Sequence, residues 1–472
     1  MTEASLGTTE SLCPVCLKRL PARRTAEGDD VYLEKLCPEH GAFRTIIWRG
    51  PPSFPSWVGP AKQPSRPRSP TEATRGCPFD CGLCPGHRQD TCCVLLEVTR
   101  RCNLACPFCF AASCKEDSDP DRTVIEGWYR SLLSRGGPYN IQLSGGEPTV
   151  REDLPDLIAL GRSLGYGFIQ LNTNGIRLAE DVRYVKSLKE AGLGCVFLQF
   201  DGTSDAVYER MRGAALLEAK TAAIAHCAEQ HLGVILVPTV VPGVNSEDLG
   251  KIIEYAAQRA PTVRGVHFQP VSYFGRYPRV PSDGDRITLP EVMSGIERQT
   301  GGRIKASQLR PPSAENAHCS FQAHFVLGSD GEFRQPMCPT GSGCCEVKVS
   351  EREGEAERGT QAGCCAPRVV AEEASRARQY VARRWAFPGG DAARGAEPDG
   401  ATRTDSLDAF LEQVERGSFC ISGMAFQDVW NIDLERLRDC FLHVAGDGGR
   451  VIPFCAHNLT DALRRPLHRP GA

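Results

Sequence analysis

The sequence predicts an α/β protein whose centre is a partial (β/α)6 barrel, with small cysteine-rich segments on either side. Between residues 94 and 300, six strand-like runs alternate with helix-like segments, and this alternation is typical of a parallel sheet. Cysteine is frequent, with 23 in 472 residues, and the cysteines fall in short clusters. Seven prolines lie between residues 51 and 75, which predicts an extended surface linker.

Each element is expected where an apolar run has the period of a strand or of a helix. A short strand is expected at 31–33, between two cysteine turns. The barrel strands are expected at 94–99, 140–143, 167–172, 195–200, 234–240 and 263–269, and the helices at 124–134, 153–164, 179–191, 214–230 and 246–259. Beyond residue 300 we expect a hairpin at 325–334, helices near 369–385 and at 434–444, and a strand at 450–454.

Composition and charge exclude several classes of protein. Hydrophobic residues make up 41% of the chain and charged residues 24%, so the chain can bury a core and is not disordered as a whole. A net charge of −3 gives no strong field for nucleic acid. No transmembrane run or signal core is visible, so we expect a cytoplasmic protein, peripheral to the membrane if its substrate is a lipid. Reduced thiols there favour metal ligation over disulfides.

The central motif is Cys102-x3-Cys106-x2-Cys109, directly after the first barrel strand. Three thiolates on one tight loop can bind three irons of a [4Fe–4S] cluster. The fourth iron would then be open to an exogenous ligand, as in a catalytic metal site. The alternative is a zinc-binding loop.

Polar and glycine residues follow the next three strands, at the edge where barrel chemistry is expected. Gly145, Gly146 and Glu147 end the second strand, where paired glycines let a ligand approach bare backbone. Asn172 ends the third strand and Gln199 the fourth, followed by Asp201. Each could be ordinary turn chemistry, but together they indicate a site.

These residues resemble the radical SAM superfamily over roughly residues 94–300. The resemblance rests on the three cysteines, on Phe108 before the last of them, and on the stretch from Gly145 to Pro148. It implies that S-adenosylmethionine binds the open iron and is cleaved by one electron to a 5′-deoxyadenosyl radical. It also implies that Phe108 packs near the adenine and that residues 145–147 bind the methionyl amine. Asn172, Gln199 and Asp201 are weaker candidates for contacts to ribose, carboxylate or substrate.

The remaining cysteines predict accessory metal sites. Cys77, Cys81 and Cys84 repeat the C-x3-C-x2-C spacing after the proline-rich stretch, and Cys92 or Cys93 could close an auxiliary cluster with them, a zinc knuckle being the alternative. Cys420, Cys440 and Cys455, with Cys319 or Cys338, could hold a second cluster. Cys13, Cys16 and Cys37 predict a mononuclear site, which His40 could complete as Cys₃His zinc; rubredoxin-like iron is the other possibility.

Along its full length the chain resembles the tetraether lipid synthases and the pterin-methylating (class D) radical SAM methyltransferases. The shared features include the turns at residues 13–16 and 37–41, the segments 77–85 and 198–202, and the stretches 237–245, 268–272, 419–420 and 452–455. The resemblance implies several iron–sulfur clusters, a rubredoxin-like iron and carbon–carbon bond formation at an sp³ carbon. An insertion at 346–404 departs from it, with the cysteine pair 364/365 inside the insertion and the pair 344/345 directly before it.

The sequence therefore predicts a radical SAM enzyme that forms a C–C bond on an unactivated carbon. Its substrate would be a lipid or a small molecule, and its electrons would come from a flavodoxin or ferredoxin. The alternative is a non-catalytic iron–sulfur or zinc scaffold. The predicted segments are a mononuclear metal domain (1–50), a linker (51–75), an auxiliary cluster segment (76–93), the radical SAM core (94–300) and a C-terminal auxiliary domain (301–472) with a mostly exposed insertion at 346–404.

Overall fold

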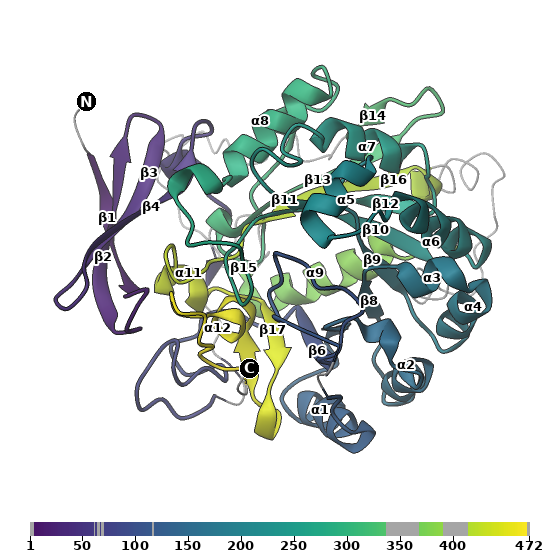
Figure 1. Cartoon of the computed structure of the whole chain (residues 1–472), viewed down its shortest axis with the longest axis horizontal. Coiled ribbons are helices and arrows are strands. Elements are labelled where there is room, and N and C mark those ends of the chain that lie inside the picture. Colours follow the sequence, from purple (N-terminus) through teal and green to yellow (C-terminus); the bar gives the residue numbers. More distant parts are fainter. Residues whose placement is uncertain are drawn as a thin grey trace, which may run out of the picture.

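The computed structural model describes residues 4–60, 62–63, 67, 70–115, 118–336, 368–389 and 414–469. A small antiparallel sheet from the N-terminus stands at one side of a larger α/β body, and C-terminal elements return into that body (Figure 1). No helix of the described segments is both long enough and apolar enough to span a membrane.

Six parallel strands form the centre of the larger sheet. They are adjacent in the order β12-β10-β9-β8-β7-β6, and all six predicted strands are confirmed, with small shifts at their ends. Every residue of β10 is buried, as expected of a parallel strand covered on both faces. The strands are β6 (Cys93–Thr99), β7 (Asn140–Gly145), β8 (Ile169–Thr173), β9 (Cys195–Gln199), β10 (Gly233–Val237) and β12 (Val263–Pro270).

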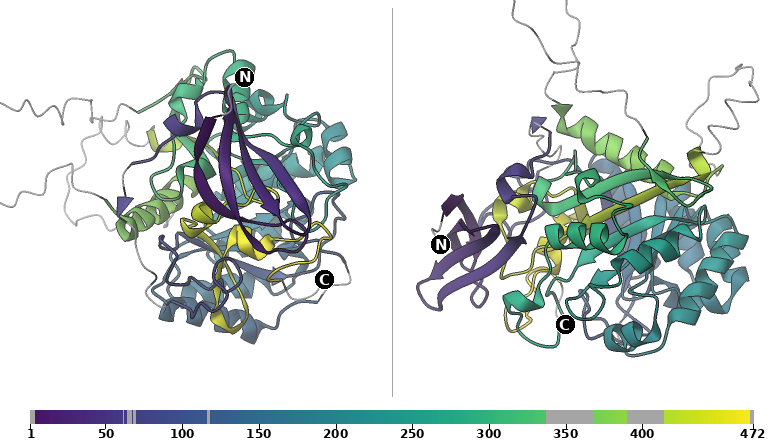
Figure 2. Two further views of the ribbon diagram at one scale, coloured as in Figure 1. Left: turned by 90° about the vertical axis from the view of Figure 1, so that its left-hand side faces the viewer. Right: turned by 90° about the horizontal axis from the view of Figure 1, so that it is seen from above.

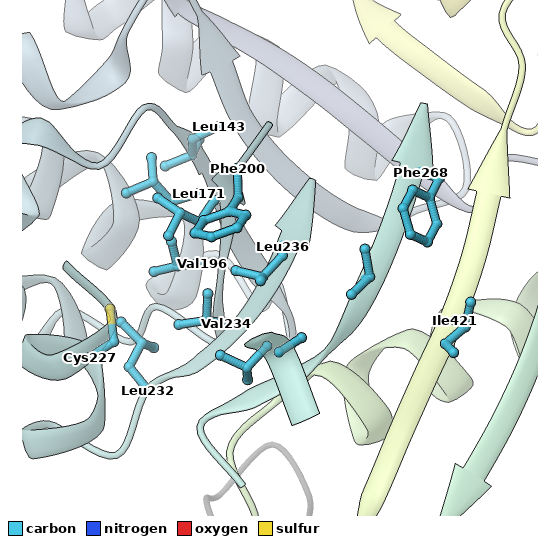
Figure 3. Packing of buried hydrophobic residues seen from close by; sticks show 14 of the residues in the cluster. Leu143, Leu171, Val196, Phe200, Cys227, Leu232, Val234, Leu236, Phe268 and Ile421 are labelled. Carbon is cyan, nitrogen blue, oxygen red and sulfur yellow. The ribbon is translucent and has the colours of Figure 1, made fainter. Parts of the chain in front are cut away.

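Helices cover the outer face of these strands and complete the apolar core (Figure 3). The helix expected at 179–191 is two helices, because the Asp181 carboxylate accepts the Arg183 N–H and starts a new one. The helix at Asp205–Arg212 was not predicted. The helices are α1 (Arg122–Ser134), α2 (Leu154–Ser163), α3 (Ile176–Glu180), α4 (Val182–Glu190), α5 (Asp205–Arg212), α6 (Leu217–Glu229), α7 (Leu249–Ala257) and α8 (Leu289–Gln299).

C-terminal strands extend the central sheet at both edges. Beside β12 lie β16 (Ser418–Met424), β13 (Ser320–Leu327) and β14 (Phe333–Arg334), and the last two form the predicted hairpin. Beside β6 lie β17 (Leu442–Ala445) and β18 (Val451–Pro453), followed by α12 (Phe454–Asn458). The helix predicted at 434–444 is wrong in its second half: α11 covers only Leu434–Arg438, because residues 442–444 pair with β6, and this pairing overrides local propensity.

Two segments that were expected to be exposed pack into the molecule. The helix predicted near 369–385 is confirmed as α9 (Val370–Trp385), and one side of it is covered, because Trp385 and the following Ala386 pack against Phe197 and Val237. In the expected linker, Trp57 is buried and its indole N–H donates to the Ala317 carbonyl at 2.9 Å. The rest of the insertion, with the pair 364/365, lies outside the described residues, as do Cys338 and the pair 344/345 before it.

The N-terminal unit is a four-stranded antiparallel sheet, of which only the centre of one strand was predicted. Its strands are β1 (Ala4–Leu12), β2 (Arg19–Glu27), β3 (Asp30–Cys37) and β4 (Gly41–Arg49). Figure 2 shows this sheet projecting from the flank of the body. The short strands β5 (Lys62–Gln63) and β15 (Arg368–Val369) pair with each other, and β11 (Thr239–Val240) pairs with β12.

Candidate active site and metal centres

A cavity of about 300 Å³ lies inside the barrel. The loop after β6, with the three cysteines of the central motif, lines one end, and Val381 and Trp385 of α9 line the other. The helix lies at the amino ends of the strands, since Asn140, the first residue of β7, donates to the Arg378 carbonyl at 3.0 Å. The residues predicted for the catalytic cluster and the cofactor that line this one cavity are Cys102, Cys106, Phe108, Cys109, Gly145, Gly146, Glu147, Asn172 and Gln199.

The cysteine loop is fixed at both of its ends. The Cys102 N–H donates to the Cys114 carbonyl at 3.0 Å. Cys109 exchanges two backbone hydrogen bonds with Arg276, at 2.9 and 3.0 Å. The Arg276 guanidinium also donates to the Cys106 carbonyl at 2.8 Å. Arg276, which the sequence did not single out, therefore positions two of the three ligand residues.

The two glycines after β7 are needed for the close approach of the cysteine loop. A Cβ atom at Gly146 would lie 2.1 Å from the Arg101 carbonyl oxygen, and one at Gly145 would lie 2.0 Å from that of Thr99. Gly145 also has a φ of +125°, a region that L side chains rarely adopt. Their absent side chains thus let the chain leading into Cys102 pack directly against the end of β7.

Glu147 joins the ends of two strands. Its carboxylate is buried and accepts hydrogen bonds from the Thr149 hydroxyl at 2.7 Å, the Thr173 hydroxyl at 2.6 Å and the Asn174 N–H at 2.6 Å. Nearby, the Asn172 amide donates to the Ser144 hydroxyl at 3.2 Å. Glu147 thereby orders the rim of the barrel, and its contact with a methionyl amine stays a prediction.

Asp201 does not line the cavity but holds a residue that does. It is fully buried, and its carboxylate accepts two hydrogen bonds from Arg212, at 2.7 and 2.8 Å. Burial acts to lower the pKa of Arg212, but the charge of Asp201 outweighs it and raises that pKa, and the guanidinium also acts on the Cys106 sulfur. Arg212 thus places a fixed positive charge beside the cysteine loop. It lies in α5, the unpredicted helix, so no local signal marked it.

The three thiols are suited to a metal cluster. Burial raises the pKa of Cys102 to about 12 and also raises the pKa of Cys106, so these thiols stay protonated until a bound cation displaces their protons. The Phe108 ring packs edge-to-face on Tyr273, with centroids 6.4 Å apart, and lines the same cavity. Three thiols on one loop with adjoining free space fit a cluster that keeps one iron open.

A charged group from the C-terminus completes the cavity wall. Glu97, in the middle of β6, accepts hydrogen bonds from Arg469 at 2.5 Å and from His457 at 3.3 Å. Burial alone would raise the pKa of Glu97, but Arg469 and His457 hold it at about 2. Arg469 also donates to the side-chain amide oxygen of Asn458 at 2.6 Å. The last described residues of the chain therefore reach into the barrel.

The N-terminal sheet carries a second ligand group. Ligand atoms of Cys13, Cys16, Cys37 and His40 all lie within 4.8 Å of one another. The His40 Nδ1 atom lies 3.6 Å from the Cys13 sulfur and 3.5 Å from the Cys37 sulfur. Three sulfurs and one imidazole are a common ligand set for structural zinc. His40 thus takes the fourth position that the sequence left open.

Comparison with known proteins agrees with this arrangement. The family described as "Radical SAM superfamily" matches residues 96–256. A curated protein of Methanocaldococcus jannaschii, 7,8-dihydro-6-hydroxymethylpterin dimethyltransferase, is 34% identical to this chain over 95% of the chain and 93% of its own length. The chain belongs to the radical SAM superfamily. The scaffold hypothesis is therefore set aside in favour of a radical SAM enzyme.

Further matches of this radical SAM enzyme are shorter. The family "HMPTM N-terminal zinc ribbon domain" matches residues 5–49, which contain the four clustered ligands. The Fe-coproporphyrin III synthase of Methanosarcina barkeri is 36% identical over 31% of this chain and 36% of its own length. Among solved structures, Streptococcus suis SuiB bound to its precursor peptide is 16% identical, with a TM-score of 0.38 over 45% of this chain and 46% of that one.

The cysteines predicted to hold an auxiliary cluster of this radical SAM enzyme lie in different surroundings. The pKa of Cys81 is raised well above its usual value, first by a hydrogen bond with Cys77 and then by burial, and the charges of Cys84 and Cys440 also act on it. Cys92 instead lies beside Phe441 and lines the barrel cavity with Cys93. The ligand set of Cys77, Cys81, Cys84 and Cys92 therefore stays a prediction.

The predicted C-terminal cysteines also lie in different surroundings. Cys319, Cys440 and Cys455 act on one another electrostatically, and the Cys455 sulfur accepts the Gln427 N–H at 3.3 Å, beyond the end of β16. Cys420 lies four residues before that end, about 13 Å away along the strand, and contacts the Tyr380 hydroxyl at 3.5 Å. Cys420 therefore does not belong with the other three, and which cysteines hold auxiliary clusters stays a prediction.

Proposed function

We propose that this radical SAM enzyme methylates a carbon atom of a small polar molecule, and that this substrate is pterin-like. The observation that carries the proposal is the chemistry of the cavity wall. Amide side chains from β7 and β8 line it, namely Asn140, Gln142, Gln170 and Asn172. An alkyl chain in this position would leave the Gln170 carbonyl oxygen, which has no hydrogen-bond partner among the described residues, unsatisfied, which is costly. The relative named above is a pterin dimethyltransferase, and this chain aligns with nearly its full length.

Some residues of this chain would bind the cluster and the cofactor, and others would enclose the reacting atoms. Cys102, Cys106 and Cys109 would hold a [4Fe–4S] cluster, which together with S-adenosylmethionine supplies one-electron cleavage of the sulfonium and hydrogen abstraction from carbon. Phe108 and the backbone of Gly145 and Gly146 would bind the cofactor. The helix α9 covers the amino end of the barrel and helps to keep water from the reacting atoms.

The accessory sites have separate proposed roles. We propose that Cys13, Cys16, Cys37 and His40 bind zinc, because their ligand set and the matching family both favour it over iron. One or two auxiliary [4Fe–4S] clusters, held by cysteines among 77–84, 319, 440 and 455, would pass electrons from an external donor such as flavodoxin or ferredoxin.

The experiment uses anaerobically purified protein with reductant, S-adenosylmethionine, 7,8-dihydro-6-hydroxymethylpterin and a reduced-folate one-carbon donor. The label is placed in turn on the methyl group of S-adenosylmethionine and on the one-carbon donor, because a molecule of S-adenosylmethionine that is cleaved to 5′-deoxyadenosine keeps its methyl group on methionine, so the transferred carbon comes from a second molecule. We expect 5′-deoxyadenosine together with a pterin product that is heavier by one or two methyl groups. Cys106→Ala should abolish both products. Cys227→Ala removes a buried core thiol that does not line the cavity, so this control should retain both.

Two results would overturn the proposal. Formation of 5′-deoxyadenosine without a methylated pterin, combined with coupling of lipid alkyl chains, would assign the enzyme to lipid synthesis. A protein that contains iron but forms no 5′-deoxyadenosine would exclude S-adenosylmethionine cleavage altogether.

A further inference from the structure

Two glutamine side chains form a pair inside the barrel. Gln142 of β7 and Gln170 of β8 are direct partners in the strand register. The Gln170 amide nitrogen donates to the Gln142 carbonyl oxygen at 3.0 Å. Both residues are more than nine-tenths buried and both line the cavity. Within the described part of the chain, the Gln170 carbonyl oxygen has no hydrogen-bond partner.

That unpaired oxygen indicates a missing ligand. Buried side-chain oxygens are nearly always hydrogen-bonded, and an exception that faces a cavity needs an explanation. A glutamine amide offers two donors and one acceptor group. The shared hydrogen bond therefore leaves the pair with a free carbonyl oxygen on Gln170, and Gln142 brings an amide NH₂ of its own.

Aromatic side chains line the same cavity near the amide pair. Phe197 of β9 and Trp385 of α9 are stacked, with ring centroids 5.3 Å apart and an interplanar angle of 24°. The His267 ring lies 5.4 Å from Phe197, and burial lowers its pKa to about 4, so it is neutral near pH 7. All three residues line the cavity. Such a surface suits the face of a flat ring.

We infer that Gln142, Gln170, Phe197 and Trp385 form the subsite that holds the flat ring of the substrate. This inference rests on the proposed function and specifies its substrate: a heteroaromatic ring with a lactam or aminopyrimidine edge. A ring N–H donates to the Gln170 oxygen, a ring carbonyl or nitrogen accepts from Gln142, and the aromatic side chains contact the face of the ring.

The layer of the two glutamines sets the orientation of the substrate, and Phe197 lies one layer further along, as the register partner of Asn172. Ser144 and Asn172 lie two residues further along β7 and β8, about 7 Å nearer to the carboxyl ends of the strands, and the cysteine loop lies beyond them. The ring therefore lies on the α9 side of the cavity, and the carbon that reacts lies on the part of the substrate that points toward Cys102, Cys106 and Cys109.

The test measures binding separately from turnover. Calorimetric titration of the metal-loaded enzyme with 7,8-dihydro-6-hydroxymethylpterin, without reductant, gives the Kd. We expect Gln170→Leu to raise the Kd about tenfold or more, because an apolar side chain of similar size removes the acceptor. Trp385→Leu should also raise it. Gln170→Glu keeps the acceptor oxygens and should bind more tightly than Gln170→Leu.

Controls separate a local effect from misfolding. Gln258→Leu changes an exposed glutamine at the end of α7 and should leave the Kd unchanged. The iron content and the midpoint of thermal unfolding of Gln170→Leu are measured beside its Kd, so that a loss of folding is distinguished from a loss of binding.

The outcomes distinguish the two claims. If the wild-type enzyme methylates the pterin and Gln170→Leu binds it as tightly as wild type does, the subsite is wrong and the proposed function stands. If the pterin binds in a Gln170-dependent way but is not methylated, the subsite stands and the proposed function falls. If the wild-type enzyme does not bind the pterin, both are overturned.

Discussion

Gly146 and Arg276 determine where the three cysteines of the central loop can lie. Arg276 binds the loop by its backbone and by its guanidinium. On the other side, the Gly146 N–H donates to the Thr99 carbonyl at 2.9 Å, and the Glu147 N–H donates to that of Arg101 at 2.8 Å. The ligand loop is thus held by backbone contacts that depend on the absence of a side chain.

Gly146→Ala should therefore displace the cysteine loop. Its new Cβ would lie 2.1 Å from the Arg101 carbonyl oxygen, and overpacking of this kind costs about 1–3 kcal/mol. We expect at least a tenfold lower rate of 5′-deoxyadenosine formation, with metal still bound at the N-terminal site, measured by chromatography and elemental analysis. Gly167→Ala has open space around its Cβ and serves as the control. Equal rates in wild type and Gly146→Ala would contradict the argument.

At the scale of the element, α9 covers the amino end of the barrel. Polar contacts anchor it: Arg264 donates to the Arg384 carbonyl at 3.2 Å, and Tyr380 contacts the Cys420 sulfur at 3.5 Å. Its apolar residues, with Trp385 foremost, face the cavity and the start of the strands. A helix that belongs to a long insertion in the sequence thus forms one end of the site.

The contact between α9 and β10 can be tested by a substitution that adds one methyl group. A Cβ atom at Gly233, the first residue of β10, would lie 2.3 Å from the Trp385 carbonyl oxygen. Gly233→Ala should push the end of α9 away and speed amide hydrogen exchange in residues 378–389, measured by mass spectrometry. Gly127→Ala in α1, whose Cβ would meet open space, should leave that exchange unchanged. Unaltered exchange in Gly233→Ala would show that α9 does not depend on this contact.

At the scale of the whole molecule, the N-terminal sheet is bound to the loop that precedes α11. Arg24 donates to the Asp433 carboxylate at 2.6 and 2.9 Å, and the Thr9 hydroxyl donates to it at 2.6 Å. The Asp433 N–H in turn donates to the Gln427 side chain, whose own backbone N–H contacts Cys455. The zinc ribbon region and one candidate cluster ligand are therefore joined by a short chain of hydrogen bonds.

Arg24→Met should loosen this docking. It leaves the buried Asp433 carboxylate without its cationic partner, and breaking a buried pair costs about 3–5 kcal/mol. We expect a lower midpoint of thermal unfolding and faster proteolysis within residues 4–49. The neighbouring Arg23 is 61% exposed, in a surface pair with Glu34, so Arg23→Met should change neither. Identical proteolysis of the two variants would show that the Arg24 pair does not hold the sheet in place.

The sequence by itself determined the features that depend on local spacing. Each of these features depends on a few neighbouring residues. They are the three cysteines of the central loop, the glycines after β7, the six parallel strands and the cysteine turns of the ribbon. Their chemistry follows from short-range rules of strand period, turn geometry and ligand spacing, so they were predicted without a structure.

Only the tertiary structure decided which distant residues meet. It placed Arg212 beside Cys106, separated Cys420 from Cys455 and packed one side of α9 against the amino ends of the barrel strands. It also paired Gln142 with Gln170 and left one oxygen of the pair unsatisfied. The physical reason is that such contacts are set by strand order and by the packing of segments far apart in the chain, which local patterns do not specify.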